Sequence, residues 1–208
     1  RWGLQFLELA PDAKVLDCGC GGGANIKRLL KKCPQGVVKG VDYSPVSVEK
    51  ARRHNAAAIG SGRCAIWQGS VERIIFASDW FDAVTAFETV YFWPNLPQCF
   101  REVYRVLKPG GYLLRVVPME RHLFELKAAV YDRPYENPPA EPAVEGFRLL
   151  RTQTLRKTIT LSSNEDVQAL FLMTPYYYKT GAEDQQKLAA VPSLRVTTEF
   201  LIAVCQKP

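Results

Sequence analysis

The stretch VLDCGCGGGA, residues 15–24, joins a short apolar run to four glycines, and a helical pattern starts directly after it. Glycines between a strand and a helix permit positive φ and let a ligand touch the backbone. Gly19, Gly21 and Ala24 also satisfy the G-x-G-x-x-A form of the dinucleotide-binding fingerprint. The stretch therefore predicts an α/β sheet with a ligand site at the end of its first strand.

Asp17 stands at the end of this strand, two residues before the first glycine. Beside a pyrophosphate its carboxylate would repel at short range, whereas S-adenosylmethionine presents an ammonium and a sulfonium that a carboxylate attracts. Asp42 ends the second expected strand, 19 residues after Gly23, where a carboxylate accepts the hydroxyls of a ribose. The pattern favours S-adenosylmethionine over a nicotinamide dinucleotide, and a purely structural glycine turn is the third interpretation.

Short apolar runs alternate with helical patterns along the first half of the chain, which is typical of a parallel sheet with helices on its faces. The expected strands are residues 14–17, 37–42, 63–68, 81–87 and 112–117. The expected helices are residues 24–33, 45–55 and 96–107, the second with Ser44 as N-cap and Pro45 in its first turn.

After residue 117 the pattern changes to a helix at 120–131, a proline-rich loop at 132–142, a long strand at 146–161, a helix at 163–173 and a final strand at 194–205. We therefore predict a single α/β domain over residues 1–208. Its fold is doubly wound around a mostly parallel seven-stranded sheet with an antiparallel C-terminal strand. Residues 1–117 are the expected cofactor-binding half. Residues 118–208 are the expected substrate-side half, with a lid at about 120–142.

Charge, cysteine and histidine content and the length of apolar runs argue against a metal site and against a membrane-spanning or secreted protein. The net charge is +6, and its excess of Lys and Arg lies on two expected helices, as solvated faces or as a footprint for a polyanion. The six cysteines form no C-x-x-C pair and the two histidines have no ligand spacing, so no metal site is expected. Without an apolar run of membrane-spanning length or a visible secretory signal, the thiols indicate a cytoplasmic protein. The chain opens with Arg1 rather than Met.

Four strings occur in order along residues 1–117: KVLDCGCGGGANIKRLL, VKGVDYS, WFDAVTAFETVYFWP and REVYRVLKPGGYLL. They resemble the successive motifs of the class I S-adenosylmethionine-dependent methyltransferases. The resemblance implies a Rossmann-like fold in which Asp17, Gly19, Gly21 and Gly23 hold the methionine end of the cofactor. It further implies that Asp42 binds the ribose and that Tyr43 packs near the adenine. Ser70 and the backbone of Val71 would recognise the adenine.

The same resemblance places the residues after the fourth strand beside the methyl group. Phe87 would lie against the cofactor, while Tyr91 and Trp93 would contact the substrate or pack in the core below the next helix. Glu88 is a candidate for a substrate contact and for a general base, although methyl transfer often needs only correct placement of a nucleophilic atom. No catalytic residue is assigned.

The second half resembles the C-terminal part of the large-subunit rRNA (guanine-N1) methyltransferases through RHLFELK at 121–127 and MTP at 173–175. This implies ribosomal RNA as partner, with His122 as a substrate contact or a structural histidine. That family also carries an N-terminal zinc-binding module, which these 208 residues do not contain. The string ETVYFWP is closer to bacterial methyltransferases of unassigned substrate.

Four functions follow for testing. The first is N-methylation of guanine in ribosomal RNA. The alternative is methylation of a small molecule, which predicts no salt-dependent RNA affinity. An oxidoreductase that binds a nicotinamide dinucleotide and a catalytically silent cofactor-binding module are more remote.

Overall fold

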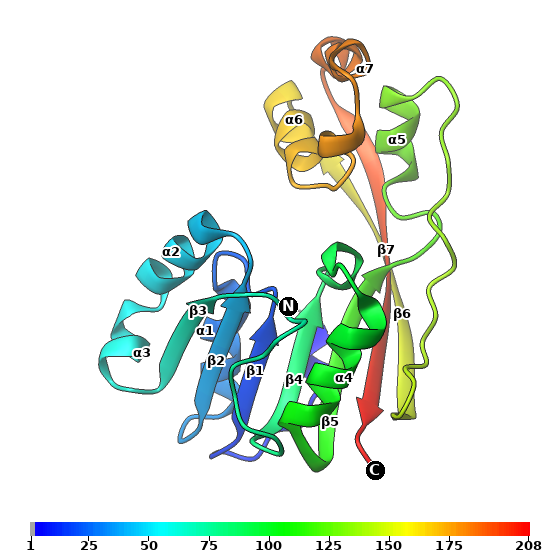
Figure 1. The fold of residues 1–208 in the computed structure, drawn as a ribbon. Helices are drawn as coiled ribbons and strands as arrows, with labels where there is room; N and C mark the ends of the chain where they lie inside the picture. The colour runs from blue at the N-terminus through cyan, green and yellow to red at the C-terminus, as the bar shows by residue number, and fades with distance from the viewer. Residues whose placement is uncertain (1–2) are drawn as a thin grey trace. The chain divides into compact units, whose positions relative to one another are not determined.

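The computed structural model describes residues 3–208, and the chain divides into two compact units (Figure 1). The first unit holds the described residues up to Val117 together with Glu141–Gln153 and Ile202–Pro208. The second holds Pro118–Ala140 and Thr154–Leu201. The expected roles of the two halves, and of a lid near 120–142, stay predictions.

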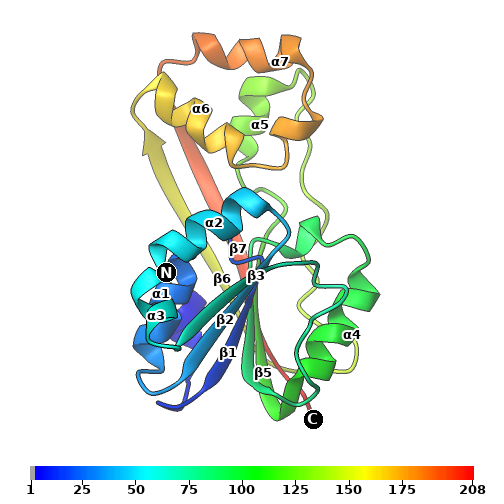
Figure 2. The same cartoon turned by 60° about the vertical axis from the view of Figure 1, so that its left-hand side comes forward.

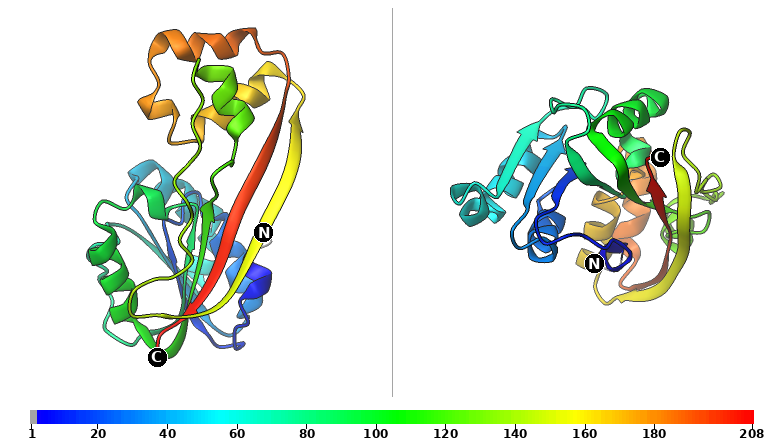
Figure 3. Two further views of the ribbon diagram at one scale, coloured as in Figure 1. Left: turned by 90° about the vertical axis from the view of Figure 1, so that its right-hand side faces the viewer. Right: turned by 90° about the horizontal axis from the view of Figure 1, so that it is seen from below.

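A seven-stranded sheet runs in the order β3-β2-β1-β4-β5-β7-β6. Its strands are β1 Lys14–Cys18, β2 Val37–Asp42, β3 Cys64–Gln68, β4 Phe81–Phe87, β5 Leu107–Pro118, β6 Arg148–Leu161 and β7 Leu194–Gln206. The first five are parallel to one another. Strand β7 is antiparallel to β5, since Gly110 N–H donates to Lys207 O and Lys207 N–H donates to Gly111 O. Strands β6 and β7 lie side by side (Figure 3). The predicted fold class is confirmed.

Helices cover both faces of the parallel strands in the first unit (Figure 2). They are α1 Ala24–Lys32, α2 Pro45–His54, α3 Ala56–Gly60 and α4 Leu96–Val106. On the face covered by α4, Cys99, Val103 and Val106 pack in a buried core with apolar side chains of the strands. Ser44 caps α2 by accepting a hydrogen bond from Ser47 N–H at 3.3 Å, as predicted.

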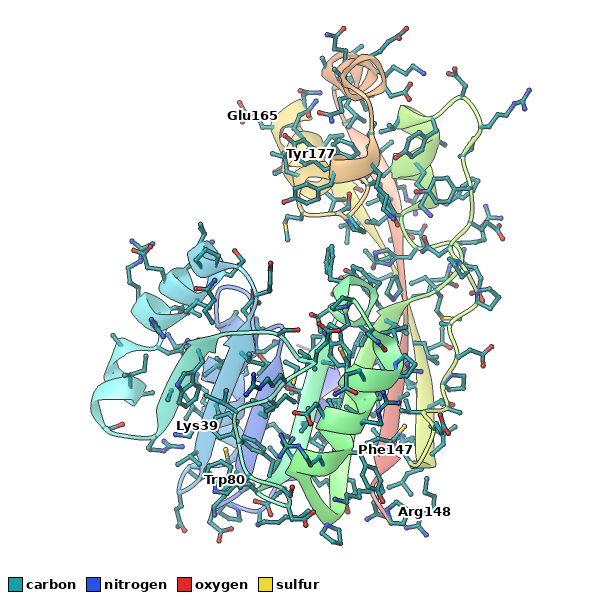
Figure 4. The ribbon with its side chains drawn as sticks, viewed as in Figure 1. Lys39, Trp80, Phe147, Arg148, Glu165 and Tyr177 are labelled. Atoms are coloured by element: carbon teal, nitrogen blue, oxygen red, sulfur yellow. The ribbon has the colours of Figure 1, made fainter. Side chains whose placement is uncertain are left out.

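The second unit contains the helices α5 Phe124–Val130, α6 Asn164–Leu172 and α7 Ala182–Lys187. Its smaller core includes buried side chains of α5 and α6 together with Leu188, which directly follows α7, and Val196 of β7. In this core Tyr177 packs edge-on against Phe171 with ring centroids 5.8 Å apart, whereas Glu165 lies in the first turn of α6 (Figure 4). Residues 132–142 contain no helix or strand, as predicted. Within the described part of the chain, no helix has both the length and the apolar character needed to cross a membrane.

Three sequence expectations were wrong in detail. Helix α4 stops at Val106 and β5 begins at once, because Leu107 pairs with Phe81 before a register shift. Helix α5 begins only at Phe124, since Leu123 has a left-handed backbone (φ 53°) that interrupts a helix. The short helices α3 and α7 were not predicted, and each is shorter than two turns.

Candidate cofactor site at the ends of β1 and β2

The turn after β1 is anchored to the end of β2 through its backbone. Gly19 N–H and Cys20 N–H both donate to Val41 O, at 2.8 and 3.1 Å. Gly19 has φ 71°, and a Cβ added there would lie 2.6 Å from Cβ of Thr89. Glycine is therefore required at this position both by its conformation and by the close approach of Thr89.

Gly21 forms the open part of the turn. Its φ is 51°, and an added Cβ would meet no atom within 4 Å. Its N–H donates to Asp42 Oδ2 at 2.7 Å. The other carboxylate oxygen, Asp42 Oδ1, accepts from Ser44 N–H at 2.9 Å. Asp42 thus joins the glycine turn to the start of α2, and each of its oxygens keeps a lone pair for a further donor.

Gly23 is held by a residue that the sequence did not point to. Asn55 donates through Nδ2 to Gly23 O at 3.1 Å and to Ala51 O at 2.9 Å. Asn55 is buried, and its Oδ1 has no hydrogen-bond partner among the described residues. The sequence signal that could have found Asn55 is a polar residue directly after an amphipathic helix. That the end of this helix lies beside the glycine turn is visible only in the structure.

Asp17 is buried, with 1% of its surface exposed. Its Oδ1 accepts a hydrogen bond from Thr85 Oγ1 at 2.7 Å, whereas Oδ2 has no partner among residues 3–208. Burial, and more weakly the nearby carboxylate of Asp42, raises the pKa of Asp17 to about 7, and the Thr85 hydrogen bond opposes this rise. Sequence reasoning missed Thr85, although a polar residue inside the apolar strand FDAVTAF was the signal.

The remaining predicted cofactor residues differ in exposure. Tyr43 follows Asp42 and is 81% exposed. Ser70 accepts from Glu72 N–H through Oγ at 3.2 Å, and Val71 is buried in the core next to α4. Phe87, half-buried at the end of β4, lies close to Gly3. Tyr43 therefore presents a free ring face, whereas Val71 offers a ligand little besides its backbone.

The stretch after β4 separates into exposed and buried side chains. Tyr91 and Phe92 are 42% and 55% exposed, and their ring centroids are 4.6 Å apart. Trp93 is buried against Phe100 of α4, with centroids 5.4 Å apart. Of the two interpretations of Trp93, its position is that of a core residue. Glu88 is exposed and adopts φ 53°, a conformation rare for a residue with a side chain.

His122 lies in the second unit, away from these elements along the chain. It is buried, its ring packs on Phe200 with centroids 4.4 Å apart, and Nδ1 lies 3.1 Å from the backbone O of Glu199. Burial lowers its pKa to about 4. These contacts are those of a structural histidine.

Two features of the first unit fit S-adenosylmethionine. Asp17 offers a buried carboxyl oxygen without a partner, which suits a cationic group. Gly21 leaves open space beside backbone that a side chain would fill, and Asp42 brings a carboxylate to the same turn. The residues present therefore fit a cationic nucleoside.

Comparison with known proteins supports this interpretation. The sequence profile of a family described as "Methyltransferase domain" matches residues 16–115. Botryococcene C-methyltransferase of Botryococcus braunii is 36% identical over 108 residues, which are 52% of this chain and 28% of that protein. The ubiquinone/menaquinone biosynthesis C-methyltransferase UbiE of Geotalea daltonii is 33% identical over 121 residues, 58% of this chain and 50% of that protein. The chain thus spans between about a quarter and half of the length of these two relatives.

Solved structures show the same fold at low identity. A Bacillus halodurans protein described as a candidate methyltransferase superposes with a TM-score of 0.67 at 20% identity, covering 100% of this chain and 97% of that one. The cyclase SpnF superposes with a TM-score of 0.70 at 20% identity, covering 100% and 79%. The fold is therefore shared with a protein named for a different reaction, and the family match and the site residues carry the assignment. Over residues 16–115 the chain is thus similar to a methyltransferase domain, a family whose methyl donor is S-adenosylmethionine.

Proposed function

We propose that this protein transfers the methyl group of S-adenosylmethionine to a small, largely apolar molecule. The observation that carries the proposal is the pair of exposed aromatic rings, Tyr91 and Phe92, directly after β4. Exposed aromatic rings at a ligand site favour flat or apolar partners. The names of the relatives point the same way, because they describe methylation of botryococcene and steps of quinone biosynthesis.

The cofactor residues have separate roles in this proposal. Asp17 and the glycine turn hold the methionine end, where the partnerless Oδ2 meets the ammonium. Asp42 accepts the ribose hydroxyls while it keeps its bonds to Gly21 and Ser44. Tyr43 lies along the adenine, and Ser70 with the Val71 backbone borders its edge.

The bound cofactor supplies an electrophilic methyl group, and the protein places the acceptor atom in line with it. Tyr91 and Phe92 hold the apolar body of the acceptor. Where the acceptor atom must lose a proton, Glu88 is the side chain that we assign to take it, because it is the carboxyl-bearing residue that directly follows β4 and neighbours the aromatic pair in sequence, and partial burial raises the pKa of its carboxyl.

Ribosomal RNA receives less support. The RHLFELK string that suggested it is used for packing inside the second unit. His122 and Lys127 are buried, and Lys127 Nζ donates to Tyr135 O and Asn137 Oδ1 at 3.0 and 2.7 Å. Of the basic residues on β6, Arg148 bonds to Gln206 and Arg151 stacks on Phe6. These side chains are therefore engaged within the protein, which weakens the case for an RNA partner.

A label-tracing assay tests the proposal. The protein is incubated with S-adenosylmethionine carrying a radioactive methyl group and, separately, with an apolar metabolite extract and with undermodified ribosomal RNA. We expect label in the apolar fraction. Replacing Phe92 by Ala should lower the apparent affinity for the acceptor roughly tenfold, the effect of losing one buried aromatic contact. Ile75→Ala is the matched control, since Ile75 is 68% exposed in the same unit. Label found in RNA alone would reject the small-molecule assignment.

A further inference from the structure

The carboxyl group of Asp17 is the least compensated acid in the first unit. It has a single side-chain hydrogen bond, from Thr85 Oγ1, and its second oxygen is buried without a partner among the described residues. An ionised carboxylate in such a place is removed from bulk solvent and forms no ion pair with the described residues, which costs several kcal/mol. Some other group must therefore neutralise it.

The titratable groups that interact with Asp17 do not provide that charge. They are Asp42 on β2, Cys18 beside Asp17 on β1 and Cys20 in the glycine turn. Asp42 adds negative charge, and burial raises the pKa of both thiols so that they stay neutral near pH 7. Thr85 on β4 contributes only its hydroxyl dipole. Within residues 3–208, no ion pair to Asp17 is formed.

We infer that Asp17 holds a proton in the ligand-free protein and releases it to solvent when the ammonium group of the cofactor's methionine end binds at Oδ2. This inference rests on the proposed function, which puts that end of the cofactor at Asp17. Asp17 is then a specificity residue that exchanges one positive charge, a proton, for another, the ammonium. The raised pKa of Asp17, about 7, agrees with the geometry.

The exchange has a thermodynamic consequence. Because binding expels a proton, the affinity for the cofactor must rise with pH up to the pKa of the free protein and level off above it. Between pH 6 and pH 7 the dissociation constant should fall about fivefold for a group that titrates near pH 7. A ligand with the same nucleoside and no amino acid should bind without proton release.

Calorimetry measures the exchange directly. S-adenosylhomocysteine is titrated into the full chain at pH 6.2 in two buffers of different ionisation enthalpy, and the difference in heat gives the number of protons released. Even the amino terminus of a peptide, with a pKa of about 7.7–8.0, is protonated at this pH, and the amino-acid end of the ligand is less acidic, so the ligand is charged before and after binding. We expect nearly one proton for S-adenosylhomocysteine and about none for 5′-methylthioadenosine.

Three variants assign the proton. Asp17→Asn should bind more weakly, release no proton and lose the pH dependence. Asp82→Asn is the matched control, because Asp82 is already compensated by Lys108 Nζ at 2.6 Å and by Lys14 N–H at 2.8 Å. It should behave as the wild type does. Thr85→Val removes the hydrogen bond that favours the ionised form, so at pH 7 its release should rise from about half a proton to about one.

The outcomes separate this inference from the proposed function. If S-adenosylhomocysteine binds without releasing a proton at pH 6.2, the inference is wrong and the cofactor site stands. Equal proton release with 5′-methylthioadenosine, or unchanged release in Asp17→Asn, also rejects it. If neither ligand binds to the wild-type chain, the cofactor site and thus the proposed function fail.

Discussion

At the scale of single residues, Asp42 has a structural and a binding role at once. Its two oxygens fix Gly21 N–H and Ser44 N–H, and the same oxygens are the ones proposed to accept the ribose hydroxyls. A group that is already held in place binds a ligand without losing further rotamer entropy. The backbone contacts of Asp42 therefore prepare it for the cofactor.

Replacing Asp42 by Ala should weaken binding of S-adenosylhomocysteine by roughly 1–3 kcal/mol, because the hydroxyl donors lose their acceptor. Calorimetry measures the change. Asp12→Ala is the control, since Asp12 is an exposed carboxylate of the same unit, and its affinity should match the wild type. An unchanged affinity in Asp42→Ala would show that the ribose lies elsewhere.

At the scale of elements, the sequence predicted those parts whose signal is local. The run before Gly19 and the Ser44 cap gave elements within one residue of the observed bounds, and the prolines at 132–142 marked a loop that extends from residue 131 to 147. Contacts between residues that are far apart in the sequence could not be predicted in this way. Thr85 and Asn55 matter because β4 and α2 bring them to the glycine turn, and that proximity is a property of the sheet order.

The end of β4 is a strained element. Glu88 adopts φ 53° while its N–H donates to Val116 O at 2.8 Å, and a β-carbon disfavours this backbone conformation. Strain of this kind is often found where a side chain has a functional position. Glu88→Gly should therefore raise the free energy of unfolding by about 0.5–1 kcal/mol and lower methyl transfer.

Urea unfolding and the label-tracing assay measure the two effects of this substitution. Glu88→Gln keeps the strained backbone, so its stability should equal that of the wild type while its activity reports on the carboxyl alone. A glycine variant less stable than the wild type would mean that Glu88 is not strained by its conformation.

At the scale of the whole molecule, two buried titratable groups give opposite responses to acid. Asp17 in the first unit has a raised pKa, so its contribution to the free energy of unfolding increases as the pH falls below 7. His122 in the second unit has a pKa lowered to about 4 by burial, so its contribution to the free energy of unfolding decreases as the pH falls. Composition showed only two histidines and could not tell that one of them is buried.

His122 should make the protein less stable as the pH falls from about 6.5 to about 4. In that window the unfolded chain takes up a proton that the folded chain excludes, and the full shift corresponds to roughly 3 kcal/mol. Urea unfolding at pH 7, 5.5 and 4.5 measures the slope. Because Asp17 acts in the opposite direction over the same pH range, each variant is compared with the wild type at each pH. His122→Asn should gain stability relative to the wild type as the pH falls, whereas His54→Asn, a change at the exposed histidine on α2, should show no such gain. If instead His54→Asn gained stability relative to the wild type at low pH and His122→Asn did not, the acid sensitivity would belong to His54, and this prediction would be wrong.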